Sequence, residues 1–286
     1  MSDPRAMTPG VRAGLVAIAS VIFWLGLSLY VFPSDTDTLF AWTINPPLTA
    51  AFLGASYWAS TTLAAACAYE RDWARGRAFA APYLIAGVVL LVVTLVHIDK
   101  FHMDDVTGWA WLVLYAIFPP SVVLLLLRQL RQPGGEPERA APMPRPLVVA
   151  QAAFGLVLAA IGTALIVAPL DAASLWPWTV TPLTGRAIGT FVLAQGVLAL
   201  TVAREADWGR VRPATLQNLV LGVLHLGGLG RFSDTLDWGT FGAWAYLGGV
   251  LFLLGVGAYG LPRCVREAPP RPAPARLRKR RSPAPS

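Results

Sequence analysis

The chain alternates long apolar runs with short polar islands as far as about residue 261. Each run has about the 17 to 25 residues that a helix needs to cross the hydrocarbon core of a bilayer. Period-two alternation is absent from the runs, and an open strand in lipid would leave its backbone groups unpaired. The pattern therefore predicts eight transmembrane helices, at residues 12–32, 48–69, 79–98, 107–127, 147–168, 184–203, 213–230 and 239–261.

The sequence also repeats itself at a nearly constant spacing. The island CAYERDWARGR (67–77) recurs as VAREADWGRVR (202–212), with six of eleven positions identical and no gap between the copies. Upstream, WTINPPLT (42–49) recurs as WTVTPLT (178–184) once one proline is skipped. Self-similarity at a fixed period is typical of a duplicated structural unit.

This duplication sets the expected domain organisation. We expect two four-helix repeats, 12–130 and 147–261, and both should enter the membrane the same way because each has an even number of spans. A short N-terminus (1–11) precedes them, and a linker rich in proline, glycine and charge (131–146) joins them and should be flexible. The proline-rich basic tail (262–286) is expected to be disordered.

Charge supports the membrane class and gives an orientation. Charged residues make up 14% of the chain, whereas a soluble domain has about a quarter. The side that contains both termini holds 20 of the 23 Lys and Arg residues, and the other side holds 3. The positive-inside rule then places both termini in the cytoplasm. We therefore expect an all-α polytopic protein of the plasma (inner) membrane.

The tail and the cysteines indicate the surroundings. Basic residues beside a membrane gain about 1 kcal/mol each from anionic lipids, so the tail is expected to lie on the inner leaflet rather than bind nucleic acid. Under the scaffold hypothesis, the tail is also the contact site for a protein partner. Cys67 and Cys264 both fall on the cytoplasmic side, which predicts free thiols. Phosphate-binding loops, cysteine clusters and nucleophile elbows are absent, so no cofactor is expected and an enzyme is the less favoured class.

The repeated island is the first candidate site. One interpretation is an interfacial turn with paired charges and an anchoring tryptophan. The other is a gate latch, in which an acid of one half binds a base of the other half. The residues are Glu70, Asp72, Trp73, Arg75 and Arg77 in the first copy and Glu205, Asp207, Trp208, Arg210 and Arg212 in the second.

The outer loop after the third run is the second candidate. It holds His97, Asp99, His102 and Asp104 close together in the sequence. His97, His102 and Asp104 are weak candidates for metal ligands, because zinc accepts imidazole and carboxylate. The same groups suit handling of a substrate or a proton, and a plain solvated loop is the third interpretation.

Polar side chains inside the apolar runs are costly and are therefore candidates for a ligand site or pathway. His225 either bonds a neighbouring helix or lines a pathway, and Gln195 in mid-run has the same two interpretations. Arg186 opposes the helix macrodipole near the start of its run. It should either extend to the headgroups or pair with an outer acid or an anionic ligand. The outer aromatic segments 40–42 and 176–178 suit an interfacial belt or a lid over a cavity.

Three segments carry a resemblance: FAWTI (40–44), HIDKFH (97–102) and WTVTPLTGR (178–186). The chain resembles a family of bacterial multi-pass membrane proteins to which no activity is assigned, and the resemblance implies no function. From the residues themselves, we expect a small-molecule or ion carrier with a site between the two repeats. The alternative is a non-catalytic membrane scaffold or partner-binding subunit.

Overall fold

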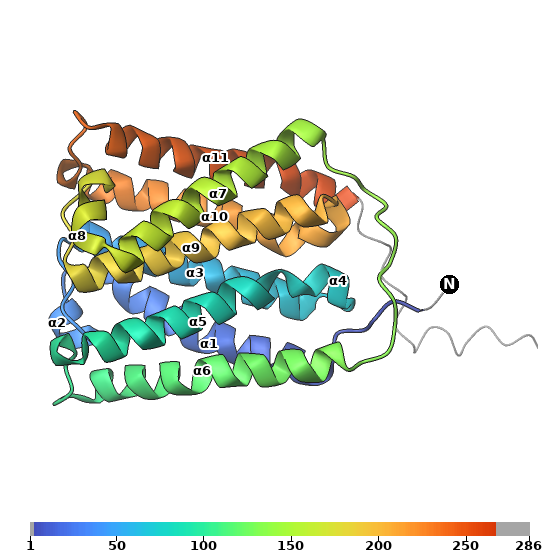
Figure 1. Ribbon diagram of the computed structural model, residues 1–286, viewed down its shortest axis with the longest axis horizontal. Helices are drawn as coiled ribbons and strands as arrows, with labels where there is room; N and C mark the ends of the chain where they lie inside the picture. Colours follow the sequence, from blue (N-terminus) through green and yellow to red (C-terminus); the bar gives the residue numbers. More distant parts are fainter. Residues whose placement is uncertain (1–2, 267–286) are drawn as a thin grey trace, which may run out of the picture.

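The computed structural model describes residues 3–266, whose regular elements are all helices (Figure 1). The eight runs predicted to be helical are confirmed as helices. The long helices are α1 (Pro9–Val31), α3 (Pro47–Tyr69), α5 (Ala80–Val96), α6 (Val106–Leu130), α7 (Arg145–Val167), α9 (Pro182–Glu205), α10 (Trp208–Arg231) and α11 (Phe241–Arg266). The short helices are α2 (Thr36–Leu39), α4 (Trp73–Gly76) and α8 (Pro169–Ala172), with 3₁₀ turns at Arg77–Phe79, Ile98–Lys100, Ala173–Leu175 and Ser233–Thr235.

Prolines and caps set the helix boundaries. Helices α1, α3, α7 and α9 all have proline in their first turn, where its missing N–H costs nothing. Thr181 begins α9 with a capping box that also involves Thr184. At the other end of α9, Ala206 takes a left-handed conformation with φ 48°. This residue turns the chain directly into α10.

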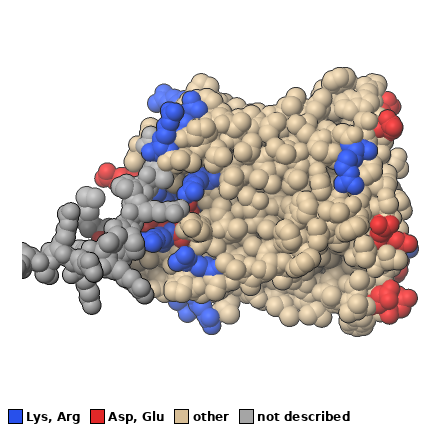
Figure 2. Space-filling view, turned by 180° about the vertical axis from the view of Figure 1, so that it is seen from behind, with Lys and Arg blue, Asp and Glu red and all other residues tan. Residues whose placement is uncertain are grey.

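Six helical segments within residues 3–266 are long and apolar enough to cross a membrane, namely α1, the α4–α5 segment, α6, α7, α9 and α11. Figure 2 shows a broad uncharged surface between an end rich in Lys and Arg and an end rich in Asp and Glu. We call these the basic end, which holds α4 and the linker, and the acidic end, which holds α2 and α8. The arrangement is compatible with an integral membrane protein.

The expectation of eight apolar spans is not met at α3 and α10, which have the length of a span but not the apolarity. Most residues of both helices are buried. Helix α3 packs on α1 and α10, and α10 packs on α11 and α3. Because these helices contact other helices more than lipid, they can carry small and polar side chains. Their mean hydropathy is therefore lower than that of a helix that faces lipid.

Helices pack closely both within each half of the chain and between the two halves. Within each half the closest pairs are α1 with α3 and α7 with α9; between the halves, α3 packs on α10 and α9 packs on α5. Glycines allow the close approach inside each half. A Cβ at Gly54 would meet the backbone of Leu29 and Tyr30, and a Cβ at Gly162 would meet the backbone of Leu193.

The end of the linker makes backbone contacts with the basic end of the bundle. It runs antiparallel to the turn before α10 as a short extended strap, and the N-terminal segment makes the same contact with the turn before α4. The backbone bonds are Met7 N–H to Arg71 O, Trp73 N–H to Arg5 O, Met143 N–H to Ala206 O and Trp208 N–H to Ala141 O.

The outer aromatic segments do not form a lipid-facing belt. Trp42 and Trp178 are buried, and Trp178 donates to Thr49 Oγ1 of the other half over 2.8 Å. Their rings pack inside the acidic end, so they belong to the core.

The last helix is longer than predicted. Helix α11 continues past 261, the predicted end of the last span, to Arg266. The rest of the predicted disordered tail, 267–286, lies outside the described residues.

Replacement of Gly162 by valine tests the α7–α9 contact. The new side chain collides with the backbone of Leu193, and backbone cannot rotate out of the way. We expect the free energy of unfolding to fall by about 1–3 kcal/mol, measured by denaturant unfolding in detergent. Gly255→Val is the matched control, because a Cβ at Gly255 meets no atom within 4 Å. Equal losses in the two variants would contradict the close contact.

Candidate functional site

The repeated charged island forms ion pairs between the two halves of the chain. Arg77 Nη2 of the first half lies 2.6 Å from Glu205 Oε1 of the second half. Arg212 of the second half lies 3.6 Å from Glu70 of the first half. The two pairs occupy corresponding positions, because Glu70 and Arg77 of the first island align with Glu205 and Arg212 of the second. Each half therefore supplies one base and one acid to the other.

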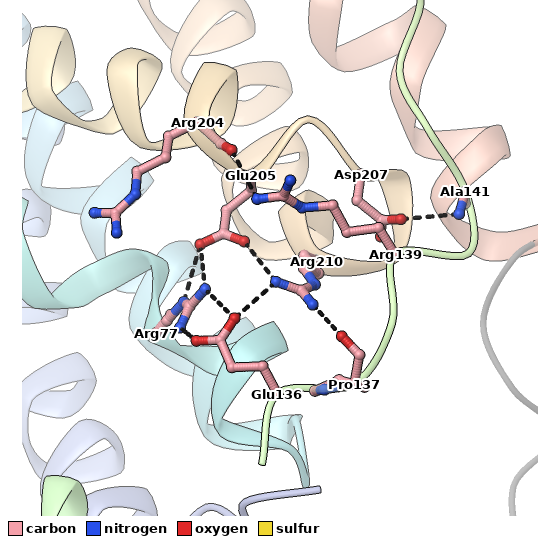
Figure 3. A network of polar contacts seen from close by, with 9 residues as sticks. All are labelled: Arg77, Glu136, Pro137, Arg139, Ala141, Arg204, Glu205, Asp207 and Arg210. Carbon is pink, nitrogen blue, oxygen red and sulfur yellow. Dashed lines mark hydrogen bonds and ion pairs between the residues drawn. The ribbon is translucent and has the colours of Figure 1, made fainter. Parts of the chain in front are cut away.

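The first pair is part of a larger network that includes the linker (Figure 3). Glu205 also accepts from Arg210 over 3.1 Å, and its side chain is only 7% exposed. Glu136 of the linker receives hydrogen bonds from both Arg77 and Arg210. The bonds from Arg77 hold the pKa of Glu136 below its usual range, with Arg210 adding to the effect. Two acids and two bases thus join α9, α10, the turn before α5 and the linker.

The second pair is weaker and more local. Glu70 has a side chain that is 13% exposed and a single 3.6 Å contact with Arg212. Burial raises the pKa of Glu70, against the opposing charges of Arg212 and Arg75. Arg75 pairs with Asp72 of the same turn. The network around Glu205 is therefore tighter than the pair of Glu70 and Arg212.

The other members of the island have structural roles. The Asp207 carboxylate accepts the backbone N–H of Ala141 over 2.8 Å and so fixes the linker strap. Trp73 and Trp208 are buried in the bundle. Trp208 packs on Tyr259 with ring centroids 6.0 Å apart. Neither ring is exposed as a headgroup anchor would be.

At the acidic end, Arg186 and His97 are brought together. Arg186 Nη1 lies 2.8 Å from His97 Nε2, and Arg186 Nε donates to the carbonyl of Ile166 over 3.0 Å. An outer acid, one of the alternatives considered for Arg186, is not among these contacts; its partners are an imidazole and a backbone carbonyl. Burial lowers the pKa of His97, and the charge of Arg186 lowers it further.

The rest of the outer loop does not assemble around these two residues. His102 lies near the Phe40 carbonyl and the Thr43 hydroxyl and so holds the chain before α3. Asp99 pairs with its exposed neighbour Lys100, and Asp104 is exposed. Among residues 3–266, no three His, Cys, Asp or Glu side chains are grouped as metal ligands. His97, His102 and Asp104 thus do not form such a group in this part of the chain.

The second half contains a cavity of about 370 Å³. Helices α7, α9, α10 and α11 surround it, and Phe52 and Ser56 of α3 close one side. Its rim includes the exposed residues Val157 of α7 and Gly248 of α11, so it opens through the apolar side of the bundle. The volume is in the range of small-molecule sites.

The cavity brings two predicted candidates together with a residue that was not predicted. His225 and Gln195, the predicted candidates, line it, and so does Tyr246. Tyr246 Oη lies 3.1 Å from His225 Nδ1. Gln195 bonds to Asn218 and receives a bond from Gln217, over 2.9 and 2.7 Å. These two candidates thus lie in one site, whereas Arg186 and His97 form another.

The corresponding place in the first half is filled. When the two islands are aligned and the alignment is extended, Gly248, Gly249 and Val250 of α11 stand where α6 has Val113, Leu114 and Tyr115. Tyr115 and Tyr57 are joined by a 2.7 Å hydrogen bond between their hydroxyls, and the Trp111 indole donates to Thr94 over 2.9 Å. Large side chains with satisfied polar groups thus replace the cavity.

Sequence reasoning missed several members of these sites. The signal for Gly248 and Gly249 was present, because a position-by-position comparison of the halves shows bulky residues in the first and glycines in the second. Gln217 and Asn218 interrupt an apolar run and were also visible. Glu136 had no signal, since nothing in a proline-rich linker predicts which carboxylate meets an arginine.

No protein-family model, no curated protein and no solved structure matches this chain. The class that the fold supports is a helical integral membrane protein. A more specific function has to come from the geometry of the chain itself.

Neutralising Glu205 should cost more stability than neutralising Glu70. Glu205→Gln leaves Arg210 without a buried counter-charge, and loss of a buried partner costs about 3–5 kcal/mol. Glu70→Gln removes a longer, single contact and should cost about 1 kcal/mol or less. Denaturant unfolding of both variants in detergent measures the difference. A larger loss for Glu70→Gln would show that the network is not as the distances indicate.

The His97–Arg186 contact has a titration signature. Protonation of His97 breaks the bond from Arg186, so this contact stabilises the fold above the ordinary histidine pKa and loses its effect as the pH falls below it. We expect Arg186→Leu to raise the pKa of His97, as measured by NMR titration of the three histidines. His102 is the internal control. Arg231→Leu is the matched variant, since Arg231 bonds the Tyr30 carbonyl instead; an unchanged His97 pKa in Arg186→Leu would refute the contact.

Proposed function

We propose that the chain is an eight-span protein of the plasma membrane, built from two four-helix repeats, with both termini in the cytoplasm. The repeats are supported by recurring contacts: the two backbone straps and the reciprocal ion pairs lie at corresponding positions of the two halves, and the aligned glycines Gly54 and Gly189 lie close against α1 and α7. The length of α3 and α10 and their place beside apolar helices support eight spans. The excess of Lys and Arg at one end supports the orientation.

We further propose that the second repeat binds a small lipophilic molecule taken from the bilayer. The observation that carries this proposal is the cavity of about 370 Å³ with its opening between α7 and α11. Its wall is mostly aliphatic and aromatic, with a few polar groups, as in ligand sites generally. A duplicated fold that fills this place in one repeat and leaves it open in the other has specialised the second repeat.

We propose that a carrier site, if the protein is a carrier, is this cavity of the second repeat and not a site between the repeats. One pocket between the halves, beside Ser60, Tyr83 and Gln217, has a volume of about 40 Å³, enough for about one or two water molecules. The larger cavity shares Trp176, Pro177 and Gly242 with an open hollow at the acidic end. Trp176 and Pro177 thus lie between a membrane-facing cavity and the outer surface, as a lid would. A carrier of this kind moves its ligand between lipid and that surface.

The partners follow from the same orientation. The bilayer surrounds the apolar helices, and the basic end faces the anionic lipids of the inner leaflet, where basic residues are attracted. The alternative is the scaffold hypothesis, with a protein partner at the basic end. The next experiment distinguishes between the two.

Refilling the cavity should abolish ligand binding. The double variant Gly248→Val and Gly249→Leu restores the residues of the first half, and the nearest atom to a Cβ at Gly249 is 3.6 Å away in the Phe154 ring. We expect durene (1,2,4,5-tetramethylbenzene) to raise the thermal unfolding temperature of the wild-type protein in nanodiscs, because binding to the native state alone stabilises it. The double variant should show no such rise.

The control is Val113→Gly with Leu114→Gly, which alters the corresponding surface of the first repeat and leaves the cavity intact. It should still bind durene. If durene stabilises the Gly248→Val, Gly249→Leu variant as much as the wild type, the cavity is not a ligand site. The scaffold hypothesis would then be favoured.

A further inference from the structure

Two nitrogen atoms in the wall of the cavity have no hydrogen-bond partner. They are Trp176 Nε1 and His225 Nε2, and both are buried. The indole N–H can only donate. Buried polar groups are nearly always paired, so an unpaired one needs an explanation, such as a missing ligand. Two such atoms in one cavity suggest that the ligand supplies the acceptor.

The contact with Tyr246 fixes what His225 offers. Between them the neutral phenol and imidazole hold two hydrogens, and only one can lie between Tyr246 Oη and His225 Nδ1. The phenol is the stronger acid and the imidazole nitrogen the stronger base, so Tyr246 donates to Nδ1. The second hydrogen is then on Nε2. With the opposite arrangement the phenol O–H would be free instead, so the pair presents one free donor in either case.

The protein offers this donor a backbone carbonyl in poor geometry. The His225 ring, which is 6% exposed, lies near the carbonyl of Phe52. That carbonyl already accepts the Ser56 hydroxyl over 2.9 Å, and it forms no bond of normal geometry with His225 Nε2. His225 Nε2 is thus a buried nitrogen without a partner of normal geometry among residues 3–266, in a side chain that lines the cavity.

The shape of the wall indicates a flat ligand. The Phe52 ring centroid lies 4.7 Å from that of His225 and 5.6 Å from that of Trp176. Tyr246 lies beside both, at 5.8 and 6.1 Å. Aromatic rings in such a group pack best against another planar ring, edge-on or offset. The opening toward lipid leaves room for an apolar tail.

We propose that the cavity binds a lipid-soluble molecule whose planar ring carries a carbonyl oxygen, as a quinone head group does, and that His225 and Trp176 donate to that oxygen. This inference rests on the proposed function and adds the chemical class of the ligand. Size agrees, since a substituted six-membered ring occupies part of 370 Å³.

Duroquinone and durene form a matched pair of probes, because they share a tetramethylated six-membered ring and differ in two carbonyl oxygens. Affinities are measured from the thermal stabilisation of the protein in nanodiscs, corrected for partition of each probe into the lipid. We expect wild-type protein to bind duroquinone about tenfold more tightly than durene, the ratio that one net hydrogen bond supplies. His225→Leu should remove most of this preference and leave durene affinity within about twofold.

Two further considerations keep the test decisive. Leu90 of the first half aligns with His225, so leucine is compatible with this place in the helix. Trp176→Phe keeps an aromatic ring, removes only the indole donor and should weaken duroquinone selectively. Equal binding of the two probes to wild-type protein, or an unchanged preference in both variants, would overturn the carbonyl inference while the cavity stands. Failure of durene to bind at all would overturn the proposed function as well.

Discussion

A polar group inside a helical membrane bundle has no water beside it and must find its partner in the protein. Much of this structure follows from that constraint. The amides of Gln195, Gln217 and Asn218 bond one another between α9 and α10, and Arg186 is satisfied by a carbonyl and an imidazole. Against this background, the two unpaired nitrogens of the cavity wall are exceptions, as are Trp42 Nε1 and the side-chain amide of Gln151 elsewhere in residues 3–266. The position of the first two beside an open volume links them to ligand binding.

The same constraint explains why the two halves are held together at the basic end. Glu205 is almost fully buried, yet it is surrounded by Arg77 and Arg210, and Glu136 completes the network from the linker. A buried charge without these partners would be costly. Because each arginine of the reciprocal pairs binds a glutamate of the other half, separation of the halves at this end would leave charges unpaired. The linker is therefore part of the interface and not only a tether.

Asymmetry between similar halves is the structural basis of the proposed site. In the first half, Trp111 and Tyr115 fill the space between helices and have bonded polar atoms. In the second half, glycines leave that space open, and Trp176 Nε1 and His225 Nε2 have no partner. One half thus retains the packing that stabilises the fold, and the other has room for function. This division agrees with the general observation that function resides in sites carried by a fold.

The sequence by itself determined the helices, because eight apolar runs of span length have few other ways to bury their backbone, and its internal similarity pointed to Glu70, Glu205, Arg77 and Arg212 before their pairing was known. It did not determine that α3 and α10 pack between other helices. Hydropathy identifies helices whose apolar side chains face lipid, and these two helices face protein. The sequence named His225 and Gln195 as candidates but could not join them to Tyr246 and Trp176, which come from distant segments. Only the tertiary structure decided which polar groups found partners, because pairing depends on distances across helices that no local pattern encodes.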